Sequence, residues 1–116
     1  MVTRQTFRRG DIVMVGFDPS SGHEQKGSAR PAVVISPFGF NQLGMTLVAP
    51  VTQGGNYARY AGFSVMLDSQ QKKIQGVVLL NQLRMLDLQA RAAKKVDTAT
   101  DEVMLELLLR VQAIVE

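Results

Sequence analysis

The chain has 116 residues and no cysteine, and 46% of its residues are hydrophobic. This length suits one domain over residues 1–116 with a core of its own, and the composition excludes a disordered chain. Without cysteine there is no disulfide framework and no thiolate metal site. The sequence has no run of about 18 apolar residues, and Met1-Val2-Thr3-Arg4 leads into polar sequence rather than into the apolar core of a signal peptide. We therefore expect a cytoplasmic protein with no membrane partner.

The net charge of +3 conceals an asymmetry along the chain. Residues 1–96 hold 12 Lys and Arg against 5 Asp and Glu, which gives +7. Residues 97–116 hold one Arg against five acidic residues, which gives −4. A basic body with an acidic tail favours a polyanionic partner that meets the body.

Short apolar and β-branched runs predict strands at residues 12–17, 32–35, 46–52, 62–67, 76–80 and 83–88. Residues 1–9 are polar and basic and are predicted to form a loose arm. Chain breakers within residues 37–44 allow a single helical turn, and residues 89–95 are predicted to be irregular or briefly helical. Pro50 has no N–H to donate, so it indicates an edge position or a bulge in its strand.

The C-terminal segment is predicted to be a helix that Thr98 caps, with Asp101 and Glu102 in its first turn. One apolar stripe follows its helical period through Met104, Leu107, Leu108, Val111, Ile114 and Val115. Leu105 and Leu109 lie outside this stripe and widen the apolar face, which indicates a subunit interface. Short strands with one terminal helix predict a mainly β fold, a small, strongly bent antiparallel barrel against which the helix packs.

The loop from Gly22 to Arg30 brings together several side chains that could take part in catalysis. It holds the only histidine, His23, next to Glu24. Imidazole, carboxylate and guanidinium groups therefore lie within eight residues, on a loop attached to the strand at 32–35. Loops that are fixed to a rigid scaffold are where binding and catalytic residues concentrate.

Five motifs resemble, in order and spacing, the MazF/PemK family, the ribonuclease toxins of bacterial toxin–antitoxin pairs. They are Gly10-Asp11-Ile12-Val13, Asp18-Pro19 with Gly22-His23-Glu24-Gln25, Arg30-Pro31-Ala32-Val33-Val34, Pro50-Val51-Thr52, and Gly76-Val77-Val78 with Gln82. Residues 40–50 and 54–59 look most like the ChpB branch. The resemblance implies an SH3-like barrel with a C-terminal helix, which acts as a homodimer. It also implies a metal-independent endoribonuclease without a cofactor, which cuts single-stranded mRNA and is silenced by a cognate antitoxin.

RNA can be cut without a metal when its own 2′-OH attacks the adjacent phosphorus and leaves a 2′,3′-cyclic phosphate. The reaction needs a base, a cation for the phosphorane and an acid for the leaving oxygen. Arg30 suits the cation, because guanidinium binds two phosphate oxygens and stays charged; the equivalent arginine of the family is catalytic. Thr52 corresponds to an active-site threonine of the family, and its hydroxyl can donate to a phosphate oxygen.

Both His23 and Glu24 are candidates for the base. The unperturbed pKa of imidazole, about 6.5, suits proton exchange at neutral pH. Glu24 would need a raised pKa, or it would serve to orient Arg30. Certain relatives carry Arg and Asp as acid and base where this chain has Leu79 and Asn81, and neither of these two side chains can take that role.

Base recognition is predicted for side chains that read base edges or stack on splayed bases, together with positions carried over from relatives. The set is Gln25, Lys26, Gln53, Asn56, Tyr57, Ala61, Phe63, Gln75, Val77, Asn81 and Gln82. Lys72 and Arg84 are predicted to be ordinary phosphate contacts or solvated charges.

Two other classes compete with this interpretation. A non-catalytic toxin resembling CcdB would share the fold and bind a topoisomerase, but such proteins rely on a C-terminal tail with tryptophan. This chain has no tryptophan and ends Ala113-Ile114-Val115-Glu116. An SH3-like module that binds RNA without cutting it is disfavoured by the intact Glu24, Arg30 and Thr52.

Overall fold

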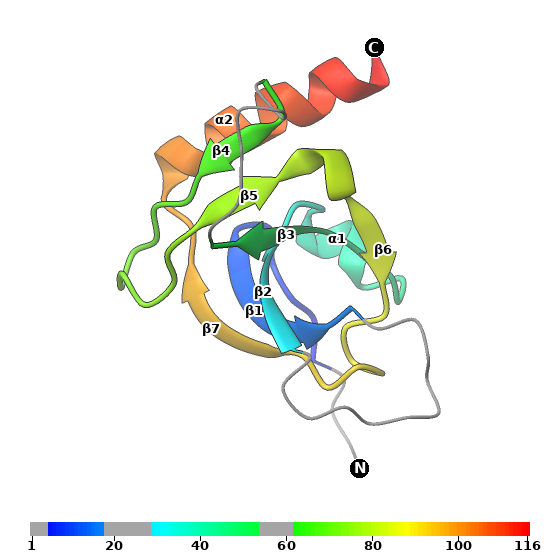
Figure 1. Ribbon diagram of the computed structural model, residues 1–116. Coiled ribbons are helices and arrows are strands. Elements are labelled where there is room, and N and C mark those ends of the chain that lie inside the picture. The colour runs from blue at the N-terminus through cyan, green and yellow to red at the C-terminus, as the bar shows by residue number, and fades with distance from the viewer. Residues whose placement is uncertain (1–4, 18–28, 54–61) are drawn as a thin grey trace.

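The computed structural model describes residues 5–17, 29–53 and 62–116. The strands are β1 (Asp11–Gly16), β2 (Ala29–Val34), β3 (Thr46–Thr52), β4 (Ser64–Met66), β5 (Val77–Leu79), β6 (Arg84–Leu86) and β7 (Lys94–Thr98). The helical segments are α1 (Phe38–Asn41), the 3-10 turn η2 (Leu80–Gln82) and α2 (Asp101–Val115). The sheet is antiparallel, in the order β4-β5-β3-β2-β1-β7, with β6 also paired to β3. Figure 1 shows how strongly this sheet curls.

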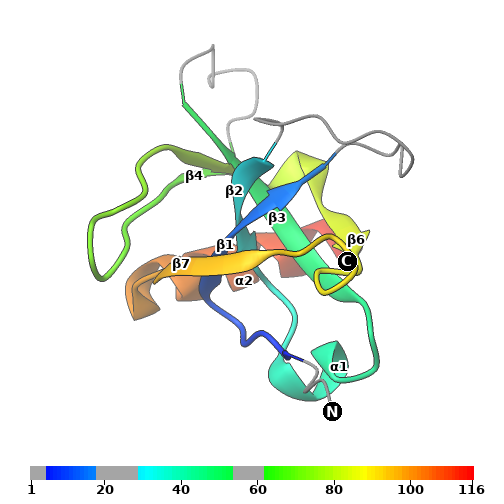
Figure 2. The same ribbon diagram turned by 90° about the horizontal axis from the view of Figure 1, so that it is seen from below.

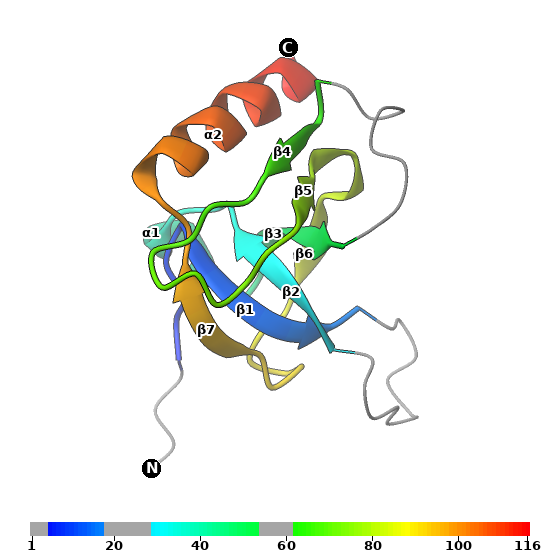
Figure 3. The same cartoon turned by 60° about the vertical axis from the view of Figure 1, so that its left-hand side comes forward.

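Two apolar clusters fill the two faces of the central strands. Val33 of β2 belongs to the cluster that includes Leu107 of α2, and its neighbour Val34 belongs to the cluster with Phe7. Successive strand residues point to opposite faces, so a continuous apolar run such as residues 32–35 is buried on both. Helix α2 lies alongside β4, where it covers the first cluster (Figures 1 and 3).

The curled sheet is not closed into a continuous barrel by the strands that the structure describes. Among the described residues, its two end strands, β4 and β7, are joined through the segment that follows β4, where Ser69 forms an isolated bridge with Ala99. The amide of Gln70 donates to the carbonyl of Thr98 at 2.8 Å, and that of Thr100 donates to Asp68 at 3.0 Å. We call this bridge the seam. The mainly β class with a C-terminal helix is thus confirmed, as an open, strongly curved sheet.

Pro50 does not mark an edge strand, as one of the sequence alternatives had it. Strand β3 is central, and β2 pairs along one side of it through Ala32↔Pro50. On the other side, β6 pairs up to Val48 and β5 begins at Val51. Pro50 therefore lies opposite the interval that η2 occupies, where the ladder is broken and a missing N–H is tolerated. Figure 1 shows the chain turning a corner between β5 and β6 there.

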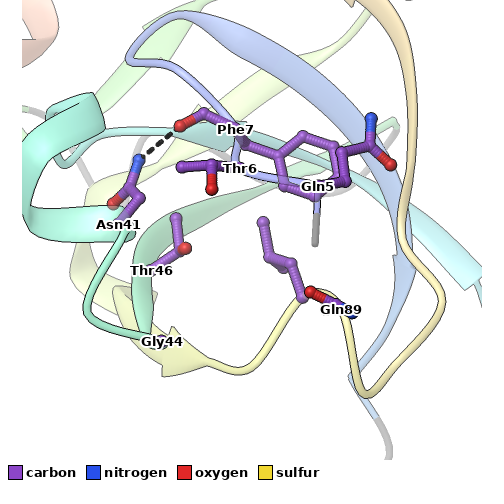
Figure 4. Close-up of a pocket in the computed structure, with 8 residues that line it drawn as sticks. Gln5, Thr6, Phe7, Asn41, Gly44, Thr46 and Gln89 are labelled. Carbon is purple, nitrogen blue, oxygen red and sulfur yellow. Dashed lines mark hydrogen bonds between the residues drawn. The ribbon is translucent and has the colours of Figure 1, made fainter. Parts of the chain in front are cut away.

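The prediction of a loose N-terminal arm is wrong for residues 5–9. Phe7 is buried, and its carbonyl accepts a hydrogen bond of 2.9 Å from the buried side chain of Asn41 (Figure 4). The small cavity beside this contact has a volume of about 10 Å³, room for about one water molecule. Figure 2 shows this segment passing next to α1. An apolar side chain and one backbone bond thus hold a segment whose polar composition predicts disorder.

The C-terminal part differs from the prediction at two points. Residues 94–98 form β7, which pairs with β1, rather than an irregular segment. Thr98 ends that strand, and the cap of α2 is Thr100, whose hydroxyl accepts from the amide of Val103 at 3.3 Å. The charged β7 lies at the end of the sheet order, where lysine side chains can reach water.

Candidate active site

Arg30 and Thr52 lie at the same end of the sheet and on the same face. Arg30 lies two residues before Ala32 in β2, and Thr52 lies two residues after Pro50 in β3, and Ala32 pairs with Pro50. Side chains two residues apart in a strand point to the same face. The antiparallel register therefore brings an exposed guanidinium and a half-buried hydroxyl to one surface, which is a pair of donors suited to a phosphate group.

The side chains that share a face with Arg30 and Thr52 continue across the sheet through β5 and β4. Thr52 pairs with Val77, and Val77 pairs with Met66. Val77 is largely buried and Met66 is exposed. This row of side chains therefore ends in one exposed apolar side chain, that of Met66, at the end of the sheet.

Gly76 lets the β4–β5 connection approach the end of β3. Its φ is +144°, and a Cβ built on it would lie 2.6 Å from the carbonyl oxygen of Thr52. Only glycine permits both this conformation and this contact. Next to it, the side-chain amide of Gln53 donates to the carbonyl of Gln75 at 3.1 Å, so two predicted RNA-binding residues lie together beside Thr52.

A cavity of about 260 Å³ opens on this connection. Its lining includes the apolar side chains of Met66 and Ile74, the amide of Gln75 and the ion-paired Lys72 and Asp68. Apolar and polar side chains thus line it together, and a concave surface of this kind can bind a small molecule or part of a larger one. The cavity adjoins the candidate site through Gly76, because this residue lines it.

Asp97 of β7 binds the backbone of the β4–β5 connection. No sequence signal indicates this role, because Asp97 stands at the start of the acidic tail. It is buried, and its carboxylate accepts from the amides of Gln71 and Lys73 at 3.0 Å and of Thr98 at 2.7 Å. Burial alone would raise the pKa of Asp97, but the nearby Ser69 side chain and the hydrogen bonds from these three amides lower it to about 2.

The remaining predicted residues fall into two groups. Phe63 lies at the other end of β4, where its carbonyl accepts from Leu80, so it is next to Asn81 and Gln82 of η2 rather than to Gln75. Outside the described residues are His23, Glu24, Gln25, Lys26, Asn56, Tyr57 and Ala61. Leu79, which replaces an arginine of certain relatives, is a buried core residue.

Two findings concern only the part of the chain that the structure describes. No three side chains of His, Asp and Glu come together there in a way that could hold a metal ion. None of the helices in that part has the length and apolar character needed to cross a lipid bilayer.

Comparison with known proteins defines the class. The family model of the PemK-like, MazF-like toxin of type II toxin–antitoxin systems matches residues 8–115. A crystal structure of MazF from Deinococcus radiodurans aligns with a TM-score of 0.77 at 32% identity, over 97% of this chain and 98% of that one. A MazE–MazF crystal structure from the same organism aligns with a TM-score of 0.78 at 28% identity, over 96% and 97%.

The chain therefore belongs to the PemK/MazF-like family of type II toxin–antitoxin toxins, as its motifs predicted. The endoribonuclease toxin ChpB of Escherichia coli (strain K12) is 65% identical over 116 residues, which is the whole of both chains. The endoribonuclease PemK of Escherichia coli is 40% identical over 112 residues, 96% of this chain and 84% of that protein. Both are named endoribonucleases, and this confirms the predicted enzyme class.

Proposed function

We propose that this protein, an endoribonuclease toxin of the PemK/MazF-like family, cleaves single-stranded mRNA through the substrate's own 2′-OH and without a metal ion. The observation that carries the proposal is the shared face and shared sheet end of Arg30 and Thr52. The 2′-oxygen bonds to phosphorus, the bond from phosphorus to the 5′-oxygen breaks, and a 2′,3′-cyclic phosphate and a 5′-hydroxyl remain.

Each donor has a separate task in this reaction. Arg30 binds the two non-bridging oxygens, on which negative charge grows in the phosphorane. Thr52 donates its hydroxyl to one of the same oxygens and helps to place the phosphate. His23 and Glu24 are the two candidates for the base that removes the 2′-OH proton. A proton must also reach the 5′-oxygen as it leaves.

Sequence selection belongs to the surface that borders these donors. Gln53 and Gln75 lie beside Thr52, and the cavity of about 260 Å³ next to them has room for a base. Phe63, Asn81 and Gln82, one strand length away, would contact a different nucleotide of the same RNA. Together with Gln25, Lys26, Asn56, Tyr57, Ala61 and Val77, these residues are the proposed RNA contacts.

Two protein partners complete the proposal. The fold neighbours include MazE–MazF crystal structures, which supports a cognate antitoxin as the inhibitor of this chain. Leu105 and Leu109 are 63% and 58% exposed on α2. Such a pair on a helix that already contributes its other face to the core supports a homodimer through α2. An mRNA substrate places the activity in the cytoplasm.

The test is cleavage of a long RNA by purified protein in excess EDTA. We expect cutting at a short sequence, products that end in a 2′,3′-cyclic phosphate, and no cutting when the nucleotide 5′ to the scissile bond is 2′-deoxy. Cleavage of the deoxy substrate, or activity that returns only with Mg²⁺, would contradict the mechanism. Binding without cleavage would favour the RNA-binding module, and inhibition of a topoisomerase would favour the CcdB-like alternative.

A further inference from the structure

Two arginines hold the base of the β1–β2 hairpin. Arg84 of β6 donates from Nη1 to the carbonyl of Phe17 at 2.7 Å, and its guanidinium carbon lies 5.5 Å from the centre of the Phe17 ring. Arg91 donates from Nη1 to the carbonyl of Gly16 at 2.9 Å. Both side chains are partly buried. Two consecutive carbonyls at the end of β1 are therefore bound by cations from a distant part of the chain.

This contact bears on Arg30 because of how β2 is paired. The β1–β2 ladder reaches Val15↔Arg30 and Gly16↔Ala29, whereas the β2–β3 ladder is formed at residues 32–34. At the level of Arg30, strand pairing with β1 is thus what fixes β2. A group that holds Gly16 and Phe17 therefore holds the backbone from which the Arg30 side chain extends.

The contacts of Arg84 differ from those of a solvated, phosphate-binding arginine. A solvated arginine would bind phosphate and add to the salt dependence of RNA binding. Here Arg84 directs Nη1 at a carbonyl and lies against an aromatic ring, a combination that a planar guanidinium makes well and an ammonium does not. The sequence-based prediction of a phosphate contact or solvated charge for Arg84 does not describe these contacts.

We propose that Arg84, together with Arg91, is a positioning residue for Arg30. The inference rests on the proposed catalytic role of Arg30. Small displacements of a group that must meet the reacting atoms can lower a rate by about 10²-fold. Loss of the Arg84 contacts with Phe17 should therefore slow the chemical step. The affinity for RNA, to which many contacts contribute, should change little.

The test compares Arg84→Met with a matched control, Arg9→Met. Arg9 also donates to a backbone carbonyl at 2.7 Å, that of Ile35, just beyond the far end of β2 from Arg30. Single-turnover cleavage gives the rate, and an uncleavable 2′-deoxy RNA gives the Kd at several salt concentrations. For Arg84→Met we expect a 10- to 100-fold slower rate with the Kd within threefold and the salt slope unchanged. For Arg9→Met we expect a rate within twofold of wild type.

Arg84→Lys keeps the charge and tests the geometry; it should recover less than a tenth of the lost rate. A slower rate for Arg9→Met than for Arg84→Met would show a general effect of lost stability and overturn the inference. So would a weaker Kd with a reduced salt slope for Arg84→Met at an unchanged rate, because that result marks a phosphate contact.

A double variant separates this inference from the function on which it rests. Arg30→Ala with Arg84→Met should be no slower than Arg30→Ala alone, since Arg84 acts through Arg30. Full loss from Arg30→Ala with normal rates for Arg84→Met would overturn the positioning role alone. Normal activity of Arg30→Ala would overturn the proposed mechanism itself. An additive loss in the double variant would show that Arg84 acts independently of Arg30.

Discussion

Arg30 is the residue on which the proposed chemistry depends most. Replacement by alanine removes a donor that meets the charge of the transition state, so cleavage should fall by about 10²–10³-fold, or roughly 3–4 kcal/mol. RNA binding should weaken only modestly. Arg30→Lys should recover little, because an ammonium cannot bind two phosphate oxygens as a fork. Single-turnover cleavage and binding to the 2′-deoxy analogue measure the two effects.

Lys72→Ala is the control for this experiment, because Lys72 is an exposed cation paired with Asp68. Because Lys72 also lines the cavity proposed to hold a base, its loss should alter RNA binding and the salt dependence of binding, while the rate of the chemical step should stay unchanged. Circular dichroism checks that each variant is folded. A folded Arg30→Ala protein that cuts within fivefold of wild type would mean that the catalytic role belongs elsewhere.

Asp97 should make stability depend on pH in a defined direction. Its pKa is about 2 in the folded protein, below the usual value of about 3.9. A lowered pKa stabilises the fold above about pH 4, and the contribution is lost as the pH falls through 2. Asp97→Asn should lower the free energy of unfolding at pH 7 by about 2–3 kcal/mol, since it weakens hydrogen bonds to a buried charge.

Urea unfolding at pH 7, 4 and 3 measures this difference, which should shrink as the pH falls. Asp101→Asn serves as the control, because Asp101 is exposed in the first turn of α2; it should cost about 0.5 kcal/mol. A difference between wild type and Asp97→Asn that stays constant down to pH 3 would contradict the assignment.

At the scale of one element, the start of α2 separates two neighbouring threonines. Thr100 accepts the capping bond from Val103, whereas Thr98 belongs to β7. Thr100→Ala should therefore destabilise the protein by about 1 kcal/mol, which thermal unfolding detects. Thr98→Ala leaves the cap intact and should cost less. A larger loss of stability from Thr98→Ala than from Thr100→Ala would contradict this assignment and favour Thr98 as the cap, as the sequence predicted.

The elements also show which sequence signals were sufficient. The apolar run at residues 32–35 predicts a buried strand, and β2 follows from it, because burial on both faces needs no alternation. Strand β7 was missed because Lys94, Lys95 and Asp97 give it no apolar period. Its partner is β1, 80 residues or more earlier in the chain, and only the fold reveals that Asp97 is buried. Local pattern cannot report a contact of this range.

The same limit applies to the site. Arg30 and Thr52 could be named from motifs, but their common face follows from the β2–β3 register. Arg84 shows the opposite case. Its sequence neighbours say nothing of Phe17, 67 residues away, so charge alone predicted an ordinary surface role. The motifs thus identify some of the residues of the site. The contacts between those residues and their neighbours depend on how the chain packs.

For the whole molecule, the exposed leucines of α2 predict the oligomeric state. We expect a dimer at micromolar concentration, seen by light scattering as twice the 12.7 kDa of one chain. Leu109→Glu places a charge on the proposed interface and should shift the protein to the monomer. Leu43→Glu is the matched control, because Leu43 is 82% exposed but follows α1. Equal effects of the two changes, or a wild-type monomer, would argue against an interface through α2.

The pairing of β1 with β7 has a consequence for how the toxin is made. Strand β1 is synthesised well before its second partner, which appears only at residues 94–98. Contacts between segments so far apart slow folding. The growing chain on the ribosome must therefore leave one edge of β1 unpaired until β7 has been made. A nascent chain that stops before residue 94 cannot complete the sheet, so the order of synthesis sets the earliest point at which the toxin acquires its native architecture.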